Sequence, residues 1–491
     1  MPMNSRSSAI TGSVVTLAGQ WIKLGLQLGS LIILSRLLSP SEIGQFALVL
    51  TVVAGAQMTS DLGLSLAAVQ SRTISHFQKS NLAWINASVG AILGLSVYLL
   101  SPLLGNFYSS DSIVPVLRVC AISFVCYGVS AQFKAELERN MKFGRLAIID
   151  IIPQLVGFGI AVCWALVAPS VWALAAQQVA VVLCMAVLTI PLSGWIPSLP
   201  RRRQHMRALL TFGAYSASGQ LVNYISSSTD TIVVGYYESP TTLGIYSRSI
   251  QIFSLPINQI AAPLTRVALP ILMSVYDNVA RYEEYLRRAQ VVLSYSFLLI
   301  FSLLFACSEP ILELLLGTDW IWGAPILQVL SIGGAFQAVG YIYYWIFLSS
   351  ARMDLQFRFG VATRLVTIVI IVAVGSHGPI WVAAGTAFGL MLNWLVYTTL
   401  GIPRAGASSW PLALIACRAF VLVALPATIW LYSSPLLPVT LPAPIQIVCY
   451  SFFLLVCIGV ACAVSRTIRA DIAGMFSIAR SLVSHKREFG H

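Results

Sequence analysis

The chain has 491 residues, of which 58% are hydrophobic and only 9% are Asp, Glu, Lys or Arg, whereas about 25% of the residues of an ordinary soluble domain are charged. So few charges cannot cover the surface of a soluble protein of this size, so a soluble fold is excluded. The net charge of +12 is compatible with a nucleic-acid-binding protein or with a membrane protein, and the positions of the basic residues decide between them.

Apolar runs long enough to cross a hydrocarbon layer about 30 Å thick recur along the whole chain. They predict an all-α polytopic membrane protein with about fourteen transmembrane helices. The predicted spans are residues 10–35, 42–67, 81–104, 113–133, 146–168, 171–194, 209–235, 241–272, 288–307, 323–350, 359–376, 379–401, 411–433 and 444–465. The tail that follows begins with an apolar stripe flanked by arginines, which is typical of an amphipathic helix on the membrane surface.

Basic residues are divided unequally between the two sides of these spans. With the N-terminus in the cytoplasm, the inward-facing segments hold 22 of the 29 Lys and Arg, and the outward loops contain only Arg36. This bias predicts that both termini are cytoplasmic. It also excludes nucleic acid as a partner, because the basic residues lie in short turns beside helix ends and not on one folded face. The nine cysteines form no CxxC pair, so we expect reduced packing residues and no metal site.

An internal repeat relates residues 11–46 to residues 211–246 without a gap. Each copy is predicted to be a long helix, a tight outward turn at Ser-Pro, and the start of a second helix. Six spans separate the copies, so both copies have the same orientation, which is typical of transporters built around a pseudo-twofold axis along the membrane normal. The matching turns contain Ser39, Pro40 and Gly44 in the first copy and Ser239, Pro240 and Gly244 in the second.

The repeat predicts two six-helix lobes with a central cavity between them. The expected domains are an N-lobe at 1–200, a C-lobe at 201–405, an additional helix pair at 406–465 and a cytoplasmic amphipathic tail at 466–491.

Ionisable residues inside a span cost at least about 2.5 kcal/mol at the helix centre unless they face protein or water. Lys23 lies in the first predicted span and Arg248 in the eighth, and we predict that both lie in the cavity and bind an anionic ligand. The alternative is an ion pair that locks helices together, for example one made by Asp230. Polar residues at helical spacing are predicted to line the same cavity: Gln20, Gln27, Gln220, Asn223, Ser227 and Gln251. Asp230 and Asp61 are candidates for an ion-coupling or a structural role.

Other residues inside the spans are given simpler interpretations. Arg118, Arg266, Arg364 and Arg418 lie nearer helix ends, where we expect their side chains to extend to the membrane interface. Prolines interrupt the eighth span at seven-residue spacing, and such a kink suits either bending during transport or static packing.

Motifs of membrane enzymes are missing from the sequence. It contains no HExxH, no GxSxG with triad partners and no phosphate-binding loop. We therefore expect no enzymatic activity, no cofactor and no ATP site. Transport would then depend on a gradient of H⁺ or Na⁺, or on the substrate gradient alone.

Two stretches of the sequence resemble a known family. Residues 34–70, LSRLLSPSEIGQFALVLTVVAGAQMTSDLGLSLAAVQ, and residues 230–260, followed by ALPILMSVYDN at 268–278, are similar to the Wzx-type polysaccharide flippases. This family belongs to the MOP superfamily, which also contains the lipid II flippase MurJ and the MATE exporters. The likeness extends over about residues 5–400.

The resemblance implies movement of an undecaprenyl-diphosphate-linked oligosaccharide from the cytoplasmic to the periplasmic leaflet of a bacterial inner membrane, for exopolysaccharide, capsule or lipopolysaccharide O-antigen synthesis. It implies alternating access of two lobes with a cationic cavity, and as partners membrane lipids, a polysaccharide polymerase and chain-length machinery. Two alternatives remain: a cation-coupled MATE-like exporter of small amphiphiles, and a membrane glycosyltransferase or polymerase. The second alternative is disfavoured because no sizeable outward loop is predicted.

Overall fold

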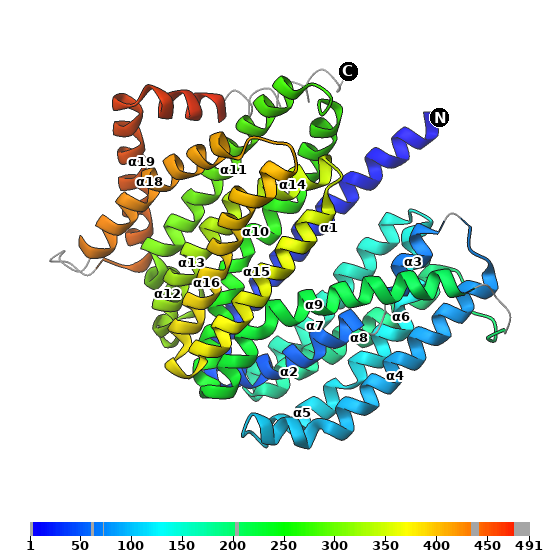
Figure 1. The fold of residues 1–491 in the computed structure, drawn as a ribbon. Coiled ribbons are helices and arrows are strands. Elements are labelled where there is room, and N and C mark those ends of the chain that lie inside the picture. The colour runs from blue at the N-terminus through cyan, green and yellow to red at the C-terminus, as the bar shows by residue number, and fades with distance from the viewer. Residues whose placement is uncertain (1–2, 60–62, 72, 202–205, 434–440, 476–491) are drawn as a thin grey trace. The chain divides into compact units, whose positions relative to one another are not determined.

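Helices account for nearly all of the residues that the structure describes, which are 3–59, 63–71, 73–201, 206–433 and 441–475 of a computed structural model (Figure 1). No strand occurs in these ranges. The chain forms two compact units, Met1–Ile245 and Tyr246–His491. The predicted lobe limits at residues 200 and 405 stay a prediction.

The first unit contains nine helices within the described residues and the first turn of a tenth. They are α1 (Met3–Leu37), α2 (Pro40–Thr59), α3 (Leu64–Gln70), α4 (His76–Phe107), α5 (Ile113–Cys120), α6 (Ile122–Arg139), α7 (Phe143–Val167), α8 (Val171–Ser193) and α9 (Arg207–Tyr237), followed by the start of α10 (Pro240–Ser274).

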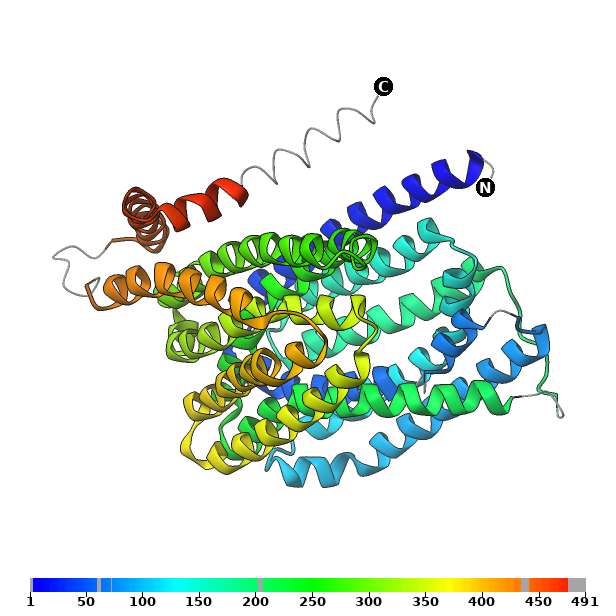
Figure 2. The same cartoon turned by 45° about the horizontal axis from the view of Figure 1, so that its top comes forward.

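The second unit continues α10 and ends in a short helix after α19. Its other elements are α11 (Val279–Ala306), α12 (Ser308–Leu316), η1 (Thr318–Gly323), α13 (Ala324–Val339), α14 (Tyr341–Ser349), α15 (Met353–Val374), η2 (Gly375–His377), α16 (Pro379–Val396), η3 (Tyr397–Gly401), α17 (Ile402–Arg404), α18 (Ser409–Ser433) and α19 (Ala443–Val464). Residues 466–475 form the tail helix, which turns sharply away from α19 (Figure 2).

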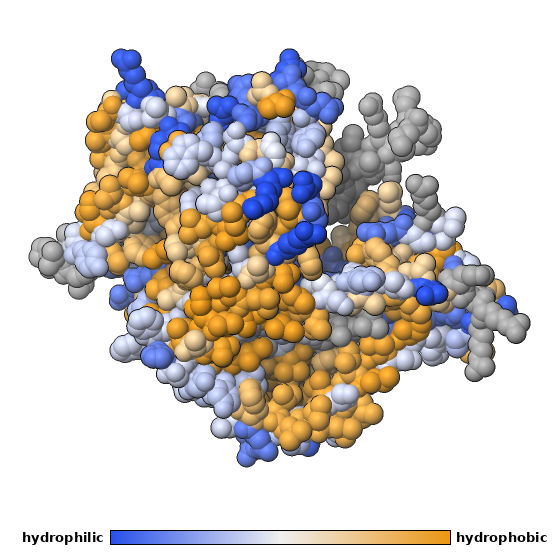
Figure 3. All heavy atoms as spheres, in the orientation of Figure 1, coloured by the Kyte–Doolittle hydropathy of each residue, from blue (hydrophilic) through white to orange (hydrophobic). Residues whose placement is uncertain are grey.

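Ten helical segments of the described chain are long and apolar enough to cross a membrane. They correspond to ten of the fourteen predicted spans. The other four predicted spans fall on α1, on α2 with α3, on α9 and on α10, which are helical but are not among the ten. The helices α9 and α10 are not among the ten because polar residues along them lower their mean hydropathy. Large apolar side chains on α4 and on α15, including Ile92, Leu99 and Val369, are exposed, as expected for lipid-facing helices. Figure 3 shows that apolar residues cover much of the visible surface.

The predicted single span at 42–67 is wrong in one respect, because α2 ends at Thr59 and α3 begins at Leu64. Gly63 lies between them with a φ of +65°, and a Cβ placed there would be 2.9 Å from the backbone oxygen of Gly213 on α9. The left-handed conformation and the close backbone approach both require glycine. The break therefore results from packing against α9.

Glycines bring helices of the first unit into direct backbone contact. A Cβ built on Gly90 of α4 would lie 2.5 Å from the backbone oxygen of Phe124, and one built on Gly128 of α6 would lie 2.4 Å from that of Asn86. Small residues at helix crossings are the usual means of packing helices in a membrane, where apolar burial alone gives little driving force. This crossing fixes α4 against α6.

Candidate functional site

Lys23 lies on α1, which packs on α7 of the first unit. A Cβ built on Gly19, one turn before Lys23, would be 3.6 Å from the Cβ of Ala147. The side chains of Gln20 and Lys23 are half-buried, and that of Gln27 is exposed. Among the described residues Lys23 forms no ion pair with a carboxylate. Its charge is therefore available to a ligand.

The polar residues of α9 divide into an exposed set and a buried acid. Gln220, Asn223 and Ser227 are all exposed. The Ser227 hydroxyl donates to the backbone oxygen of Tyr224 at 3.0 Å. Asp230 is only 7% exposed, and it accepts hydrogen bonds from the backbone N–H and the hydroxyl of Thr231 at 2.7 and 3.3 Å. At 3.6 residues per turn Asp230 lies on the same side of α9 as Asn223, but its carboxylate is buried.

Arg248 and Gln251 come together on α10 in the second unit. Nη1 of Arg248 donates to Oε1 of Gln251 at 2.5 Å. Nε of Arg248 is buried and has no hydrogen-bond partner in the described part of the chain. No carboxylate of the described residues forms an ion pair with this arginine. An unsatisfied guanidinium donor is costly to bury, and an anionic ligand would satisfy it.

The predicted cavity residues therefore occupy both units. Lys23 and the residues of α9 belong to the first unit, and Arg248 with Gln251 belongs to the second. Asp61 and the side chain of Arg266 lie outside the described residues. The assignment of Lys23 and Arg248 to one cavity stays a prediction.

A polar pocket within the first unit was not predicted. It has a volume of about 280 Å³, and its walls include Gln57, Tyr127, Ser130, Lys134 and Glu138. Nζ of Lys134 donates to Oδ1 of Asp150 at 3.0 Å, and Nε2 of Gln178 donates to the Tyr127 hydroxyl at 3.2 Å. Lys134 directly follows the predicted span 113–133, where the sequence indicates only a role in membrane topology. The signal that could have predicted this pair is the presence of a basic residue, Lys134, and an acidic residue, Asp150, near the adjoining ends of two consecutive predicted spans.

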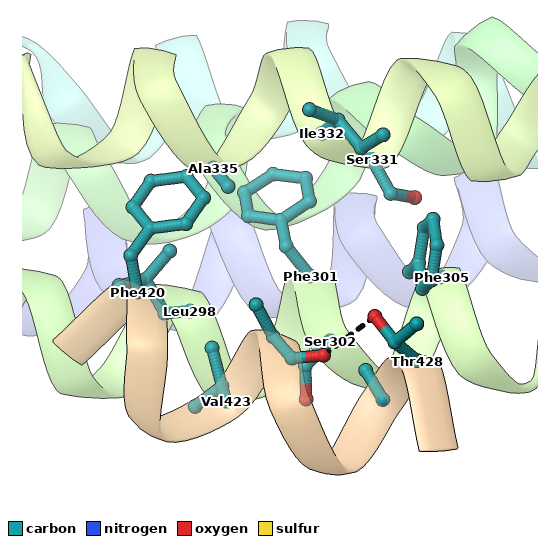
Figure 4. A pocket seen from close by; sticks show the side chains of 12 residues that line it. Leu298, Phe301, Ser302, Phe305, Ser331, Ile332, Ala335, Phe420, Val423 and Thr428 are labelled. Atoms are coloured by element: carbon teal, nitrogen blue, oxygen red, sulfur yellow. Dashed lines mark hydrogen bonds between the residues drawn. The ribbon is translucent and has the colours of Figure 1, made fainter. Parts of the chain in front are cut away.

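A second pocket lies within the second unit, where side chains of α11, α13 and α18 converge (Figure 4). Its volume is about 230 Å³, and Phe301 and Phe420 form much of its wall. Its hydroxyls are satisfied locally: the Ser331 hydroxyl donates to the backbone oxygen of Leu327, and that of Thr428 donates to that of Ala424. The Ser302 hydroxyl likewise lies 2.8 Å from the Tyr450 hydroxyl, so the lining is mainly apolar and its hydroxyls all have partners within the unit.

Several basic residues of the segments predicted to face inward also make specific contacts in the first unit. Nζ of Lys79 lies 2.7 Å from Oε2 of Glu136. Nη1 of Arg139 donates to the backbone oxygens of Ala68 and Ser71, each at 2.6 Å. These contacts hold α3 and α4 against α6.

Two of the arginines expected to extend to the interface have defined partners. Nε of Arg118 donates to the Ser101 hydroxyl at 3.1 Å, and its guanidinium lies 5.4 Å from the centre of the Tyr98 ring. Nη2 of Arg418 lies 3.2 Å from Oδ2 of Asp471 in the tail helix. Arg418 thus connects α18 to the tail.

Comparison with solved structures identifies the fold. The lipid II flippase MurJ in an inward closed conformation matches with a TM-score of 0.70 at 14% sequence identity, covering 91% of this chain and 98% of that one. An inward-facing MATE multidrug transporter of the MOP superfamily matches with a TM-score of 0.58 at 15% identity, covering 82% and 98%. The predicted all-α, MurJ- and MATE-like fold class is confirmed.

Sequence comparison identifies relatives over much of the chain. The lipopolysaccharide biosynthesis protein WzxC of Escherichia coli K12 is 24% identical over 405 residues, 81% of each chain. The teichuronic acid biosynthesis protein TuaB of Bacillus subtilis 168 is 28% identical over 305 residues, 62% of this chain and 63% of its own. The succinoglycan biosynthesis transport protein ExoT of Rhizobium meliloti 1021 is 24% identical over 309 residues, 63% and 62%.

These relatives agree with the resemblance seen in the sequence and with the prediction that the chain is not an enzyme. The family profile described as polysaccharide biosynthesis protein matches residues 33–325, more than half of the chain. The chain is a multi-pass membrane protein that belongs to the polysaccharide biosynthesis protein family.

Proposed function

We propose that the protein moves an undecaprenyl-diphosphate-linked oligosaccharide from the cytoplasmic to the periplasmic leaflet of a bacterial inner membrane by alternating access of two lobes. The product would be used for exopolysaccharide, capsule or O-antigen synthesis, together with a polymerase and chain-length machinery. Membership of the polysaccharide biosynthesis family supports the class of substrate. Arg248, which has a buried Nε and no carboxylate partner among the described residues, is the observation that carries the proposal.

The exposed polar face of α9 supports a water-filled path. Gln220, Asn223 and Ser227 are exposed on a helix of a membrane protein, and polar side chains that face lipid are costly. They are better accommodated beside water or a polar substrate. Amides and hydroxyls can both donate to and accept from sugar hydroxyls, so this face suits an oligosaccharide.

Lys23 and Arg248 have side chains that can bind a diphosphate. Arginine presents a planar set of donors that fits phosphate oxygens, and lysine acts as a compact point charge. Neither Lys23 nor Arg248 is neutralised by a carboxylate in the described residues. In the proposed cycle both contact the diphosphate while the polyprenyl tail stays in the bilayer. Asp230, buried on α9, is a candidate for coupling to H⁺ or Na⁺.

Export of polysaccharide from cells that depend on this protein tests the proposal. We expect Lys23→Ala and Arg248→Ala to abolish export at normal membrane levels of the protein, and Arg248→Lys to retain part of it, because charge is kept while the planar donor set is lost. Arg118→Ala is the matched control, since Arg118 already has partners within the first unit. Unchanged export in both alanine variants would remove the cationic-cavity proposal.

A MATE-like exporter of small amphiphiles is the second candidate, because the fold is shared with a MATE transporter. Cells that express the protein would then accumulate less of a cationic dye. We expect no change in dye accumulation and a loss of polysaccharide in cells that lack the protein.

A further inference from the structure

A cationic pocket lies within the second unit, between α11, α18 and the tail helix. It has a volume of about 390 Å³. Its charged walls are Arg287 and Arg288 of α11, Arg418 of α18 and Asp471 of the tail helix. By the predicted topology this end of α11 faces the cytoplasm, so the pocket lies at the level of the inner-leaflet headgroups.

The ion pairs around the pocket leave donors available. Nη2 of Arg418 lies 3.2 Å from Oδ2 of Asp471, which also accepts a hydrogen bond from the Tyr295 hydroxyl at 3.1 Å. Nη2 of Arg287 lies 3.5 Å from Oε2 of Glu283, and Arg288 pairs with Glu284. A guanidinium has five N–H donors, so one such contact does not saturate it.

Exposure and burial show which donors a ligand could reach. The side chains of Arg287, Arg288 and Arg418 are 52%, 63% and 36% exposed. Nε of Arg418 is buried and has no hydrogen-bond partner within the described ranges. Three arginines against one aspartate on the pocket wall therefore favour an anion with several acceptor oxygens.

An apolar groove begins at the same arginine. The groove has a volume of about 730 Å³ and is formed by α18, α19 and Ile468 of the tail helix. Arg418 lines both the groove and the cationic pocket, and the other groove residues are apolar or cysteine. From Arg418 to Ile429 the groove follows α18 for about 16 Å at 1.5 Å per residue, which is close to half of a hydrocarbon layer about 30 Å thick.

We propose that the cationic pocket and this groove together bind one anionic phospholipid of the inner leaflet, such as phosphatidylglycerol. Arg287, Arg288 and Arg418 hold the phosphate, and an acyl chain occupies the groove between α18 and α19. Basic pockets between helices on the cytoplasmic side of a membrane are suited to anionic headgroups. A free phosphate would leave the groove empty, and a zwitterionic lipid would place an ammonium group near three arginines.

The bound lipid would hold the tail helix against the transmembrane helices. Asp471 already connects the tail to Arg418 and Tyr295, and Ile468 forms part of the groove. The phosphate would therefore contact α11 and α18 at the place where the tail is anchored. This lipid is distinct from the transported substrate, so the site can be tested without measuring transport.

Native mass spectrometry of the purified full-length protein tests the site with phosphatidylglycerol, phosphatidylcholine, undecaprenyl phosphate and inorganic phosphate as probes. We expect one tightly retained phosphatidylglycerol. Arg287→Gln with Arg288→Gln should weaken its binding about tenfold or more, as the loss of charge-assisted hydrogen bonds to phosphate predicts. Arg281→Gln, which removes an exposed arginine of the same helix outside the pocket, should leave binding unchanged.

A groove variant separates a lipid from a free anion. Val421→Trp fills the groove without removing a charge, so it should weaken phosphatidylglycerol binding while the protein keeps its melting temperature. Equal retention of phosphatidylcholine, or no effect of either variant, would overturn the proposal. Preference for undecaprenyl phosphate would also overturn it and assign the groove to the substrate. Inorganic phosphate that displaces the lipid completely would show a free-anion site instead.

Discussion

The two copies of the internal repeat are alike at their turns and different along their helices. A Cβ built on Gly44 would lie 1.7 Å from the backbone oxygen of Pro240, and one built on Gly244 would lie 1.9 Å from that of Pro40. The contact is reciprocal and lies within the first unit. Each turn requires glycine because the backbone of the other copy occupies the position of a side chain.

The charged residues do not follow the repeat. At the offset of 200 residues that relates the copies, Lys23 corresponds to Asn223, and Arg248 corresponds to Leu48, which is buried. Lys23 thus lies on the first helix of the first copy, whereas Arg248 lies two residues beyond the matched range, on the helix that begins in the second copy. The turn is therefore repeated for packing, whereas the cations differ between the copies, as the proposed binding of an asymmetric ligand would require.

The largest expected effect comes from breaking the shared turn. Gly44→Ala or Gly244→Ala places a methyl group where a backbone carbonyl already lies, so the starts of α2 and α10 must move apart. We expect the free energy of unfolding to fall by about 3 kcal/mol, the upper end of the usual range for overpacking. We expect little protein in the membrane and a lowered melting temperature. Gly25→Ala is the control, because a Cβ there meets nothing within 4 Å. Normal levels of the Gly44 and Gly244 variants would contradict the reciprocal contact.

A second prediction exchanges the residues that differ between the copies. The double variant Lys23→Asn with Asn223→Lys keeps the net charge and moves the cation from α1 to α9. Because a diphosphate is held by directed, short-range contacts, we expect polysaccharide export to fall about tenfold or more at normal membrane levels. Full export would mean that only the total charge of the cavity matters.

A third prediction concerns the exposed polar face of α9. Gln220→Leu with Asn223→Leu removes two exposed polar groups without touching a cation. Each lost hydrogen bond to a sugar is worth about 1 kcal/mol, so export should fall several-fold while membrane levels stay normal. Tyr215→Leu on the same helix, where the exposed residue is aromatic, is the control. An equal loss in the control would indicate a general defect of α9.

Most of the fold could be predicted from the sequence because the bilayer imposes long apolar helices. The break between α2 and α3 could not, since Gly63 takes its conformation from the approach of Gly213 on a helix about 150 residues further on. The repeat matched the turns correctly because Ser and Pro have local roles at a helix start, and because Gly44 and Gly244 make the same contact with the other copy.

The candidate site was predictable only in part. A cation inside a predicted span, such as Arg248, can be recognised from the sequence. In the described residues Arg248 has no carboxylate partner, as a ligand-binding role requires. The pairing of Lys134 with Asp150 and of Arg418 with Asp471 depends on which helix ends meet. Apolar periodicity along single spans does not determine such contacts.

The smallest expected effect distinguishes the two turns from each other. Ser39 and Glu42 form a reciprocal cap: the Ser39 backbone N–H donates to Glu42 Oε2 at 2.8 Å, and the Glu42 N–H donates to Ser39 Oγ at 3.4 Å. In the second copy the Thr242 N–H donates to Ser239 Oγ at 3.2 Å, and Ser239 Oγ lies 3.0 Å from the neutral Thr242 hydroxyl. The Ser39 hydroxyl instead donates to the Glu42 carboxylate at 3.0 Å, and a hydrogen bond to a charged acceptor is stronger. We therefore expect Ser39→Ala to lower stability by about 1 kcal/mol and Ser239→Ala by less, as measured by the melting temperatures of the purified variants. A larger loss for Ser239→Ala would show that the two turns differ in more than their caps.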